Sequence, residues 1–224
     1  VGSEMCIRDS HSLTHELKTP ITSIRGATEL LREDMPEADR ANFLQNIQNS
    51  NQRMSRLVDR MLSLAKLEGL TELVSTEEFD AIPTIQRLLR ERETLLAEQN
   101  LRVELDTSAP FLCTGDRVLI GQAIANLLDN AIAFSHPSTA LTIALNQHNN
   151  RYRIEIRNQG EPIPEFALPK LYDRFFSFPR PNPDRSASKS TGLGLSFVKE
   201  IMKLHHGEVQ VLNVAGGVAA VLIW

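Results

Sequence analysis

The chain has 224 residues, of which 42% are hydrophobic and 23% are charged, and its formal net charge at pH 7 is −4. This composition is that of an ordinary globular protein and excludes wholesale disorder; the acidic balance argues against a general nucleic-acid binder, which carries a basic patch. Two cysteines, Cys6 and Cys113, are too few for a disulfide framework or a thiolate metal site, which fits a reducing cytosol. No run is long and apolar enough to cross a bilayer, which needs about 20 residues.

The first ten residues, VGSEMCIRDS, differ in character from the rest of the chain. They show neither helical periodicity nor a signal-peptide pattern, and they resemble an adapter-derived artefact at the end of a metagenomic reading frame. We therefore expect residues 1–10 to be a non-native or artefactual leader, and no element is predicted for them.

Residues 11–69 are predicted to form a helical hairpin. Apolar or small residues recur at helical spacing over 13–31, where Pro20 is expected to interrupt the helix, and again over 43–65, with Gly69 as the C-cap. A short polar break between the two helices predicts an antiparallel pair. Each helix would leave its apolar stripe half covered. Either a second copy completes a four-helix bundle, or the hairpin packs on the rest of its own chain.

After a linker at residues 70–78, residues 79–224 are predicted to form a separate domain of helices and strands. Strands segregated from helices indicate an α+β fold, an α/β sandwich with helices on one face of a mixed sheet. His205 and His206 are expected at a helix C-terminus, where cations suit the helix dipole. Helices are predicted over 83–98, from a cap at Asp116 to Phe134, and over 193–205, and strands over 101–106, 141–145, 152–157, 208–212 and 218–223.

The string from Ser12 to Pro20 carries the first group of reactive side chains. On a helix, His15 and Thr19 share a face, and Glu16 adjoins His15. Neutral imidazole is a good nucleophile toward phosphorus, and a neighbouring carboxylate can hold the proton of one ring nitrogen and aim the other. By itself, the same arrangement fits an exposed His–Glu pair that does no chemistry.

A second group lies on the predicted helix that Asp116 caps. Asn126 and Asn130 are four residues apart and so share a helical face. Amide oxygens in this arrangement can coordinate Mg²⁺ and orient a triphosphate. Taken alone, the two residues equally fit the polar side of an amphipathic helix.

Three further segments follow in the C-terminal half. The run from Asn158 to Pro164 comes directly after a predicted strand and by itself predicts a turn, while Leu171 to Phe176 is an aromatic cluster that fits a core. Ser190 to Ser196 contains glycines that open a helix, where backbone amides can approach phosphate oxygens. The basic, proline-containing stretch over 177–190 predicts a loop.

In this order, the five segments resemble the H, N, G1, F and G2 boxes of bacterial sensor histidine kinases, and the resemblance covers Ser12 to the C-terminus. Within that family, the run from Lys189 to Leu195 is most similar to CreC-type kinases. The resemblance implies a HisKA dimerisation and phosphoacceptor hairpin followed by a GHKL ATPase domain, with ATP and Mg²⁺ as cofactors. It implies that His15 is phosphorylated, that Glu16 acts in acid–base catalysis, and that Thr19 supports a phosphatase reaction. It implies metal ligation by Asn130, with Asn126 beside it, and nucleotide binding by Asn126, Asn130, Asn158, Gly160, Pro162, Ile163, Phe175, Lys189, Thr191, Gly192, Leu193, Gly194 and Leu195.

Three positions depart from the family pattern. Ala133 stands where a basic residue is often found, and Asn158 and Pro162 replace the Asp and the second Gly of Asp-x-Gly-x-Gly. An Asn oxygen can accept a hydrogen bond from the adenine amine, but that bond lacks charge assistance. These departures motivate an alternative, in which the chain is a non-catalytic or weakly active nucleotide-binding scaffold.

The function that the resemblance implies is ATP-dependent autophosphorylation of His15, then phosphotransfer to an aspartate of a response regulator and phosphatase action on that regulator. The implied partners are a second copy of the chain and the receiver domain of a cognate regulator, without direct contact to nucleic acid. The implied location is the cytoplasmic portion of a bacterial inner-membrane protein whose anchor precedes this sequence.

Overall fold

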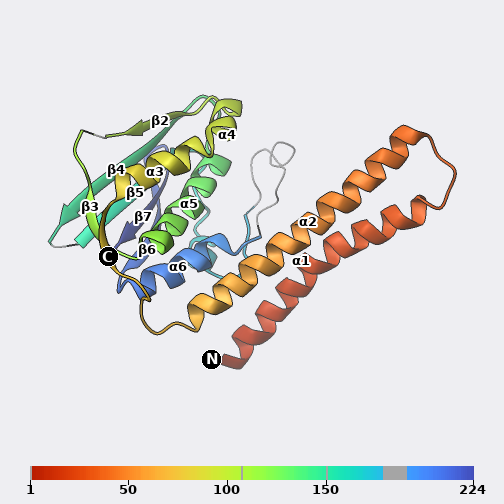
Figure 1. Ribbon diagram of the computed structural model, residues 1–224, viewed down its shortest axis with the longest axis horizontal. Helices are drawn as coiled ribbons and strands as arrows, with labels where there is room; N and C mark the ends of the chain where they lie inside the picture. Colours follow the sequence, from red (N-terminus) through yellow and green to blue (C-terminus); the bar gives the residue numbers. More distant parts are fainter. Residues whose placement is uncertain (1, 107, 150, 179–190) are drawn as a thin grey trace.

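The computed structural model describes the chain except for residues 1, 107, 150 and 179–190. A long helical hairpin extends to one side of a compact α/β domain (Figure 1). This arrangement confirms the predicted α+β class with an N-terminal hairpin and a C-terminal sandwich. Within the described residues, no helix has both the length and the apolar character that a membrane span requires.

The hairpin consists of α1 (Gly2–Leu30) and α2 (Glu37–Glu68). Two local expectations were wrong. Helix α1 includes residues 2–10, for which the sequence predicts no helix. Extending an existing helix adds one hydrogen bond per residue and needs no apolar stripe. It also continues through Pro20 without a break. Gly69 is the C-cap of α2 as predicted, but its φ of −75° is one that any residue adopts.

The domain is built on a five-stranded sheet in the order β2-β4-β5-β7-β6. Strand β2 pairs parallel with β4, and the other pairs are antiparallel, so the sheet is mixed as predicted. The predicted hairpin near residues 141–157 is present as β4 and β5. The strands are β2 (Arg102–Leu105), β4 (Ala140–His148), β5 (Arg151–Gln159), β6 (Glu208–Val214) and β7 (Gly217–Ile223).

A second, two-stranded sheet pairs β1 (Glu77–Asp80) with β3 (Leu112–Gly115). Neither strand was predicted from the sequence, because four residues are too few to show a clear alternation. The side chain of Asp80 accepts hydrogen bonds from the backbone N–H groups of Ile82 and Phe111, at 3.0 Å each. It thereby caps the next helix and ties the two strands together.

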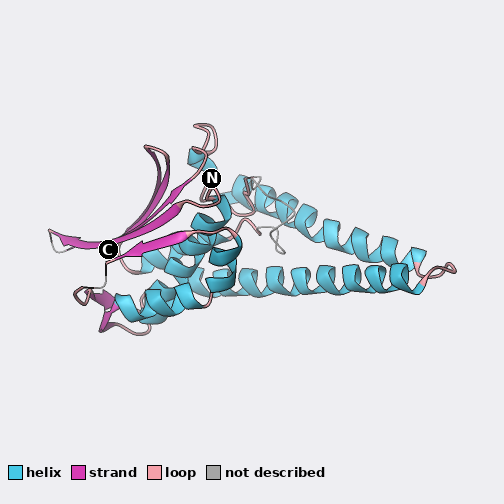
Figure 2. Cartoon of the chain, turned by 90° about the horizontal axis from the view of Figure 1, so that it is seen from above, coloured by secondary structure: helices cyan, strands magenta, loops and turns pink. Residues whose placement is uncertain are grey.

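The remaining helices cover one face of the large sheet (Figure 2). They are α3 (Ala81–Arg90), α4 (Glu93–Glu98), α5 (Arg117–Phe134) and α6 (Gly194–Leu204), with a short 3-10 turn η1 (Leu168–Lys170) between β5 and α6. The single helix predicted over 83–98 is divided at Arg92, whose guanidinium bonds the Leu88 carbonyl oxygen and the Asp129 carboxylate. The domain core lies between these helices and the sheet, and its fully buried side chains include Ile85, Ile120, Ile124, Leu127, Leu128, Leu141, Ile154 and Ile156.

Hairpin and domain are in contact along α2 and α6. Leu57 and Leu64 of α2 are buried in one apolar cluster with Leu193, which directly precedes α6. An ion pair between Glu68 and Arg174 closes the end of this contact. The hairpin is therefore packed on its own C-terminal domain, as one of the two alternatives for its apolar stripes expects.

Candidate functional site

A largely apolar pocket of about 330 Å³ opens between α5, the sheet and the loop before α6. Its size falls within the range of small-molecule sites. The pocket brings together residues that are far apart in the sequence and that were predicted to bind nucleotide. These are Asn130, Asn158, Pro162, Ile163, Gly192, Gly194 and Leu195.

Asn158, at the end of β5, is the buried polar group of this pocket, with 4% of its surface exposed. Its amide nitrogen donates a hydrogen bond of 3.2 Å to the carbonyl oxygen of Phe134, the last residue of α5. Because that carbonyl can only accept, the amide orientation is fixed, and Oδ1 is left as the acceptor for a ligand. Gly160 is required beside it, since a Cβ atom there would lie 2.2 Å from the same carbonyl oxygen.

Helix α5 carries the two predicted amides. It begins as predicted at Asp116, whose side chain accepts from the N–H groups of Val118 and Leu119. Asn130 lines the pocket. Asn126, one turn earlier, donates its amide nitrogen to the helix's own Gln122 carbonyl oxygen at 2.8 Å. Its Oδ1 atom faces Gly194, because a Cβ atom added to Gly194 would lie 3.2 Å from that oxygen.

No group of three or more His, Cys, Asp or Glu side chains that could hold a metal ion is found in the described parts of the chain. The donor set at this site is instead amide oxygen, from Asn130 and Asn126. Mg²⁺ prefers oxygen ligands and usually keeps several waters or substrate phosphates in its coordination shell. The site therefore suits Mg²⁺ that arrives with a nucleotide, and does not resemble a metal site formed by the protein alone.

The loop before α6 is held in an unusual backbone conformation. Gly192 has a φ of +66°, and its carbonyl oxygen accepts a hydrogen bond of 2.9 Å from the N–H of Phe175, which itself has a φ of +63°. A Cβ atom at Gly192 would lie 2.4 Å from the Phe175 carbonyl carbon, so only glycine fits. Phe175 and Leu193 belong to the cluster with α2 and do not line the pocket. The predicted residue Lys189 lies outside the described residues.

Several residues that line the pocket were not predicted from the sequence. Leu127, Ala131 and Phe134 lie on the same side of α5 as Asn130. The other unpredicted lining residues include Ile156, Leu171, Phe176, Val211, Val218 and Ala220. The spacing along α5 could have revealed the first three, because residues three and four apart share a helical face. The strand residues could not be assigned, since the order of strands in the sheet was unknown.

The predicted acceptor residue, His15, lies in α1, and its side chain is outside what the structure describes. Leu13 and Leu17, on either side of it in the sequence, pack against the cluster that contains Leu193. The Glu16 carboxylate forms an ion pair of 2.8 Å with the guanidinium of Arg53 on α2. Both side chains are about a quarter exposed, at 26% and 24%. Thr19 is exposed on α1.

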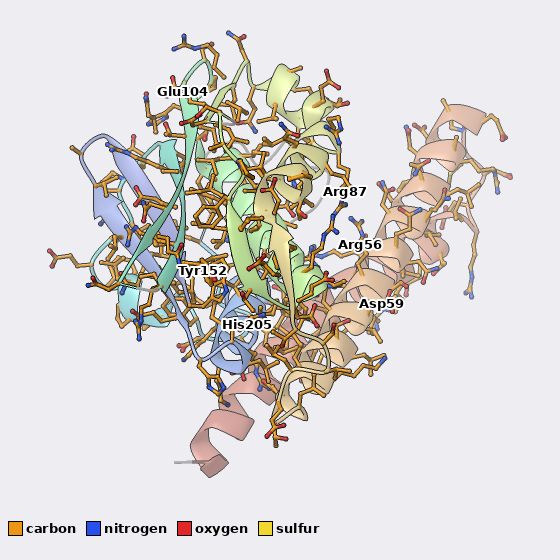
Figure 3. The ribbon with its side chains drawn as sticks, turned by 60° about the vertical axis from the view of Figure 1, so that its left-hand side comes forward. Arg56, Asp59, Arg87, Glu104, Tyr152 and His205 are labelled. Atoms are coloured by element: carbon orange, nitrogen blue, oxygen red, sulfur yellow. The ribbon has the colours of Figure 1, made fainter. Side chains whose placement is uncertain are left out.

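His205 departs from the expectation of a cation at a helix C-terminus. Its ring is buried between the end of α6 and the start of α5 (Figure 3). Nε2 accepts a hydrogen bond of 3.0 Å from the Asp116 N–H, and Nδ1 donates to the Ile201 carbonyl oxygen at 2.8 Å. Burial lowers the pKa of His205 below its usual value, outweighing the opposing effects of the Ile201 bond and of Asp116. The ring is therefore a neutral bridge that holds α5 to α6.

Two family descriptions match the chain, one over the helical hairpin and one over most of the α/β domain. Residues 10–70 match the His Kinase A (phospho-acceptor) domain, and residues 115–224 match the Histidine kinase-, DNA gyrase B-, and HSP90-like ATPase domain. The chain belongs to the sensor histidine kinase family and comprises its catalytic core, a phospho-acceptor domain followed by an ATP-binding domain. This confirms the family that the five sequence segments indicate.

Individual relatives agree with this assignment. Sensor protein CreC of Escherichia coli is 39% identical over 95% of this chain and 44% of its own length. Sensor protein CzcS of Cupriavidus metallidurans is 29% identical over the same shares, 95% and 44%. The chain thus spans less than half the length of these curated relatives.

Solved structures show the same fold. The Acinetobacter baumannii histidine kinase AdeS is 27% identical, with a TM-score of 0.73 over 93% of this chain and 96% of the other. Histidine kinase ThkA, solved in complex with response regulator protein TrrA, is 24% identical, with a TM-score of 0.75 over 98% of this chain and 60% of the other. The second likeness concerns the fold alone.

Proposed function

We propose that this chain transfers the γ-phosphoryl group of ATP to His15. The observation that carries the proposal is the packing of the hairpin on the loop that directly precedes α6, residues 191–193, which we call the nucleotide loop. Leu13 and Leu17 flank His15 in the sequence and pack in one cluster with Leu193, which stands between Gly192 and Gly194 of the pocket lining. This contact brings α1, the helix that carries His15, against the loop that leads into the pocket.

The adenine end is proposed to lie in the pocket, with its amine donating to Oδ1 of Asn158. The phosphates would run past Asn130 toward Gly194 at the N-terminus of α6, whose backbone amides favour negative charge. Asn130, with Asn126 beside it, would hold Mg²⁺, which neutralises charge on the transferring phosphoryl group. The apolar lining suits a planar ring, and Asn158 and Asn130 supply polar groups for the nucleotide.

In the proposed step, an unprotonated imidazole nitrogen of His15 bonds to the γ-phosphorus as the bond from that phosphorus to the bridging oxygen breaks, and ADP leaves. The other ring nitrogen keeps its proton, which the Glu16 carboxylate can hold. Rate enhancement in such a transfer comes from positioning and charge neutralisation. Thr19, one helical turn later, is proposed to orient water in a phosphatase reaction.

The partners are proposed to be a second copy of the chain and the receiver domain of a response regulator, whose aspartate would take the phosphoryl group. Exposed apolar side chains on both helices of the hairpin support a dimer, since a second hairpin would cover them. They are Ile21, Leu30, Leu44, Val58 and Leu62, each 46–56% exposed. The parent protein is proposed to be anchored in a bacterial inner membrane, with this core on the cytoplasmic side.

Incubation of the purified chain with labelled ATP and Mg²⁺ tests the acceptor. The label should be stable to base and labile to acid, as expected for phosphate on an imidazole nitrogen, and His15→Ala should abolish it. His206→Ala is the matched control, because His206 is exposed at the far end of α6 and should leave labelling unchanged. Equal labelling of His15→Ala and the unaltered chain would refute His15 as the acceptor, whereas absence of labelling in the unaltered chain would favour the scaffold alternative.

The metal assignment has its own test. Asn130→Ala should abolish labelling because a ligand for Mg²⁺ is lost, whereas Asn146→Ala on the exposed surface of β4 should not. Retention of normal labelling by Asn130→Ala, with the same Mg²⁺ requirement, would remove Asn130 from the metal site.

A further inference from the structure

A second cavity, of about 760 Å³, lies where the hairpin meets the ATPase domain. Arg60 and Lys66 of α2 line one side of it, and Asn126 and Gly194 line the other. Gly194 also lines the nucleotide pocket, and the side-chain oxygen of Asn126 lies 3.2 Å from the place of a Cβ on Gly194. The cavity and the pocket therefore meet at the first residue of α6.

The charged groups of this cavity favour an anion. Arg60 and Lys66 contribute two positive charges from the hairpin. The carboxylate in the lining, Asp129, forms an ion pair of 2.7 Å with Arg92, so its charge is already compensated. The N-terminus of α6 adds the partial positive charge of its backbone amides. A phosphate that leaves the pocket toward the hairpin would enter this positive region.

Arg60 of the hairpin forms a hydrogen bond with the loop that precedes α6. Its Nη1 atom donates a hydrogen bond of 3.1 Å to the hydroxyl oxygen of Thr191, a residue that is only 9% exposed and directly precedes Gly192. A guanidinium carries several donors in a rigid planar fork, so Arg60 can bond Thr191 and a phosphate oxygen together. The contact with Thr191 thus places the fork at the phosphate end of the pocket.

We infer that Arg60 is a binding residue for the terminal phosphate of a nucleoside triphosphate, supplied by the hairpin to the ATPase domain. The inference rests on the proposed function, because it takes the adenine end to lie at Asn158. From there a triphosphate passes Asn130 and Gly194, and its third phosphate reaches the cavity, whereas a diphosphate ends one group short. Arg60 then makes domain docking depend on the third phosphate.

Calorimetry on the whole chain with Mg²⁺ tests this, using ADP and a non-hydrolysable ATP analogue as the two ligands. Arg60→Ala should weaken binding of the ATP analogue about tenfold, as expected for the loss of one charge-assisted hydrogen bond, and should change ADP binding less than about twofold. Arg56→Ala is the matched control: Arg56 lies one turn away on α2 (Figure 3), bonds the Gln52 carbonyl oxygen and does not line the cavity.

Four results would overturn the inference. An unchanged preference for the ATP analogue in Arg60→Ala would show that the guanidinium does not contact the third phosphate. An equal loss for both ligands would show that Arg60 acts only through Thr191 and the loop. An equal effect of Arg56→Ala would show that Arg60 acts only through its positive charge and not through a specific contact with the third phosphate. Failure of the unaltered chain to bind either ligand would contradict the proposed function as well.

Discussion

Replacing Asn158 by Asp should strengthen nucleotide binding but weaken the stability of the fold. The sequence comparison alone predicts that Asn158→Asp tightens nucleotide binding, because a carboxylate makes a charge-assisted bond with the adenine amine. The structure adds a cost, because the amide nitrogen of Asn158 donates to the Phe134 carbonyl oxygen at 3.2 Å. A carboxylate in its place would set one acceptor against another.

The cost can be sized from the burial of the site. Asn158 is 4% exposed, so water cannot replace the lost donor, and a buried acceptor without a partner costs about 1–3 kcal/mol, with a charged group toward the upper end. We therefore expect Asn158→Asp to lower the free energy of unfolding by about 2–3 kcal/mol. The gain in nucleotide affinity should be roughly fivefold, since the charged bond adds about 1 kcal/mol.

Urea denaturation without nucleotide measures the first effect, and calorimetry measures the second. Asn213→Asp is the control: the Asn213 amide donates to the Ile163 carbonyl oxygen at 2.8 Å in the same manner, but its side chain is exposed, so its loss should cost less than about 1 kcal/mol.

The stability deficit of Asn158→Asp should also depend on pH. Burial raises the folded-state pKa of the introduced carboxyl above its unfolded value of about 3.9. A raised folded pKa gives stability that is present at low pH and is lost as the pH rises through the folded pKa. The deficit should shrink toward pH 4, where the protonated carboxyl can donate to the Phe134 carbonyl oxygen. A variant as stable as the unaltered chain at pH 7, or a deficit that does not change with pH, would refute the reasoning.

Three other predictions follow from single contacts. Arg53→Ala should slow labelling of the chain with ATP, because Glu16 loses the 2.8 Å ion pair that positions it. Arg53→Lys should restore part of the rate. Equal labelling rates in the two variants and the unaltered chain would exclude a positioning role for Arg53. Gly160→Ala should lower the free energy of unfolding by about 1–3 kcal/mol in urea titration, since its Cβ would lie 2.2 Å from the Phe134 oxygen, and an unchanged midpoint would contradict this. Burial lowers the pKa of His205, so its contribution to stability is present above the unfolded pKa of about 6.5 and is lost as the pH falls through the folded pKa; His205→Gln should flatten that pH dependence, and an unchanged slope would exclude His205 as its source.

Features that depend on neighbouring residues can be predicted from the sequence alone. Asp116 and the apolar spacing after it define α5 because capping and amphipathic periodicity act within a few turns. Alternation on either side of a polar turn likewise defines the β4–β5 hairpin. The family was also evident from the order of the five segments, because motif identity does not require knowledge of the fold.

Tertiary structure decided what depends on residues far apart in the chain. The bond from Asn158 to Phe134, the burial of His205 against α5, and the contact from Arg60 to Thr191 each join segments that local pattern cannot relate. Phe175 shows the same limit, because its positive φ and its place beside α2 follow from the packing around Gly192. Local periodicity thus specifies which elements form, whereas the sheet order and the docking of the hairpin specify which side chains face a nucleotide.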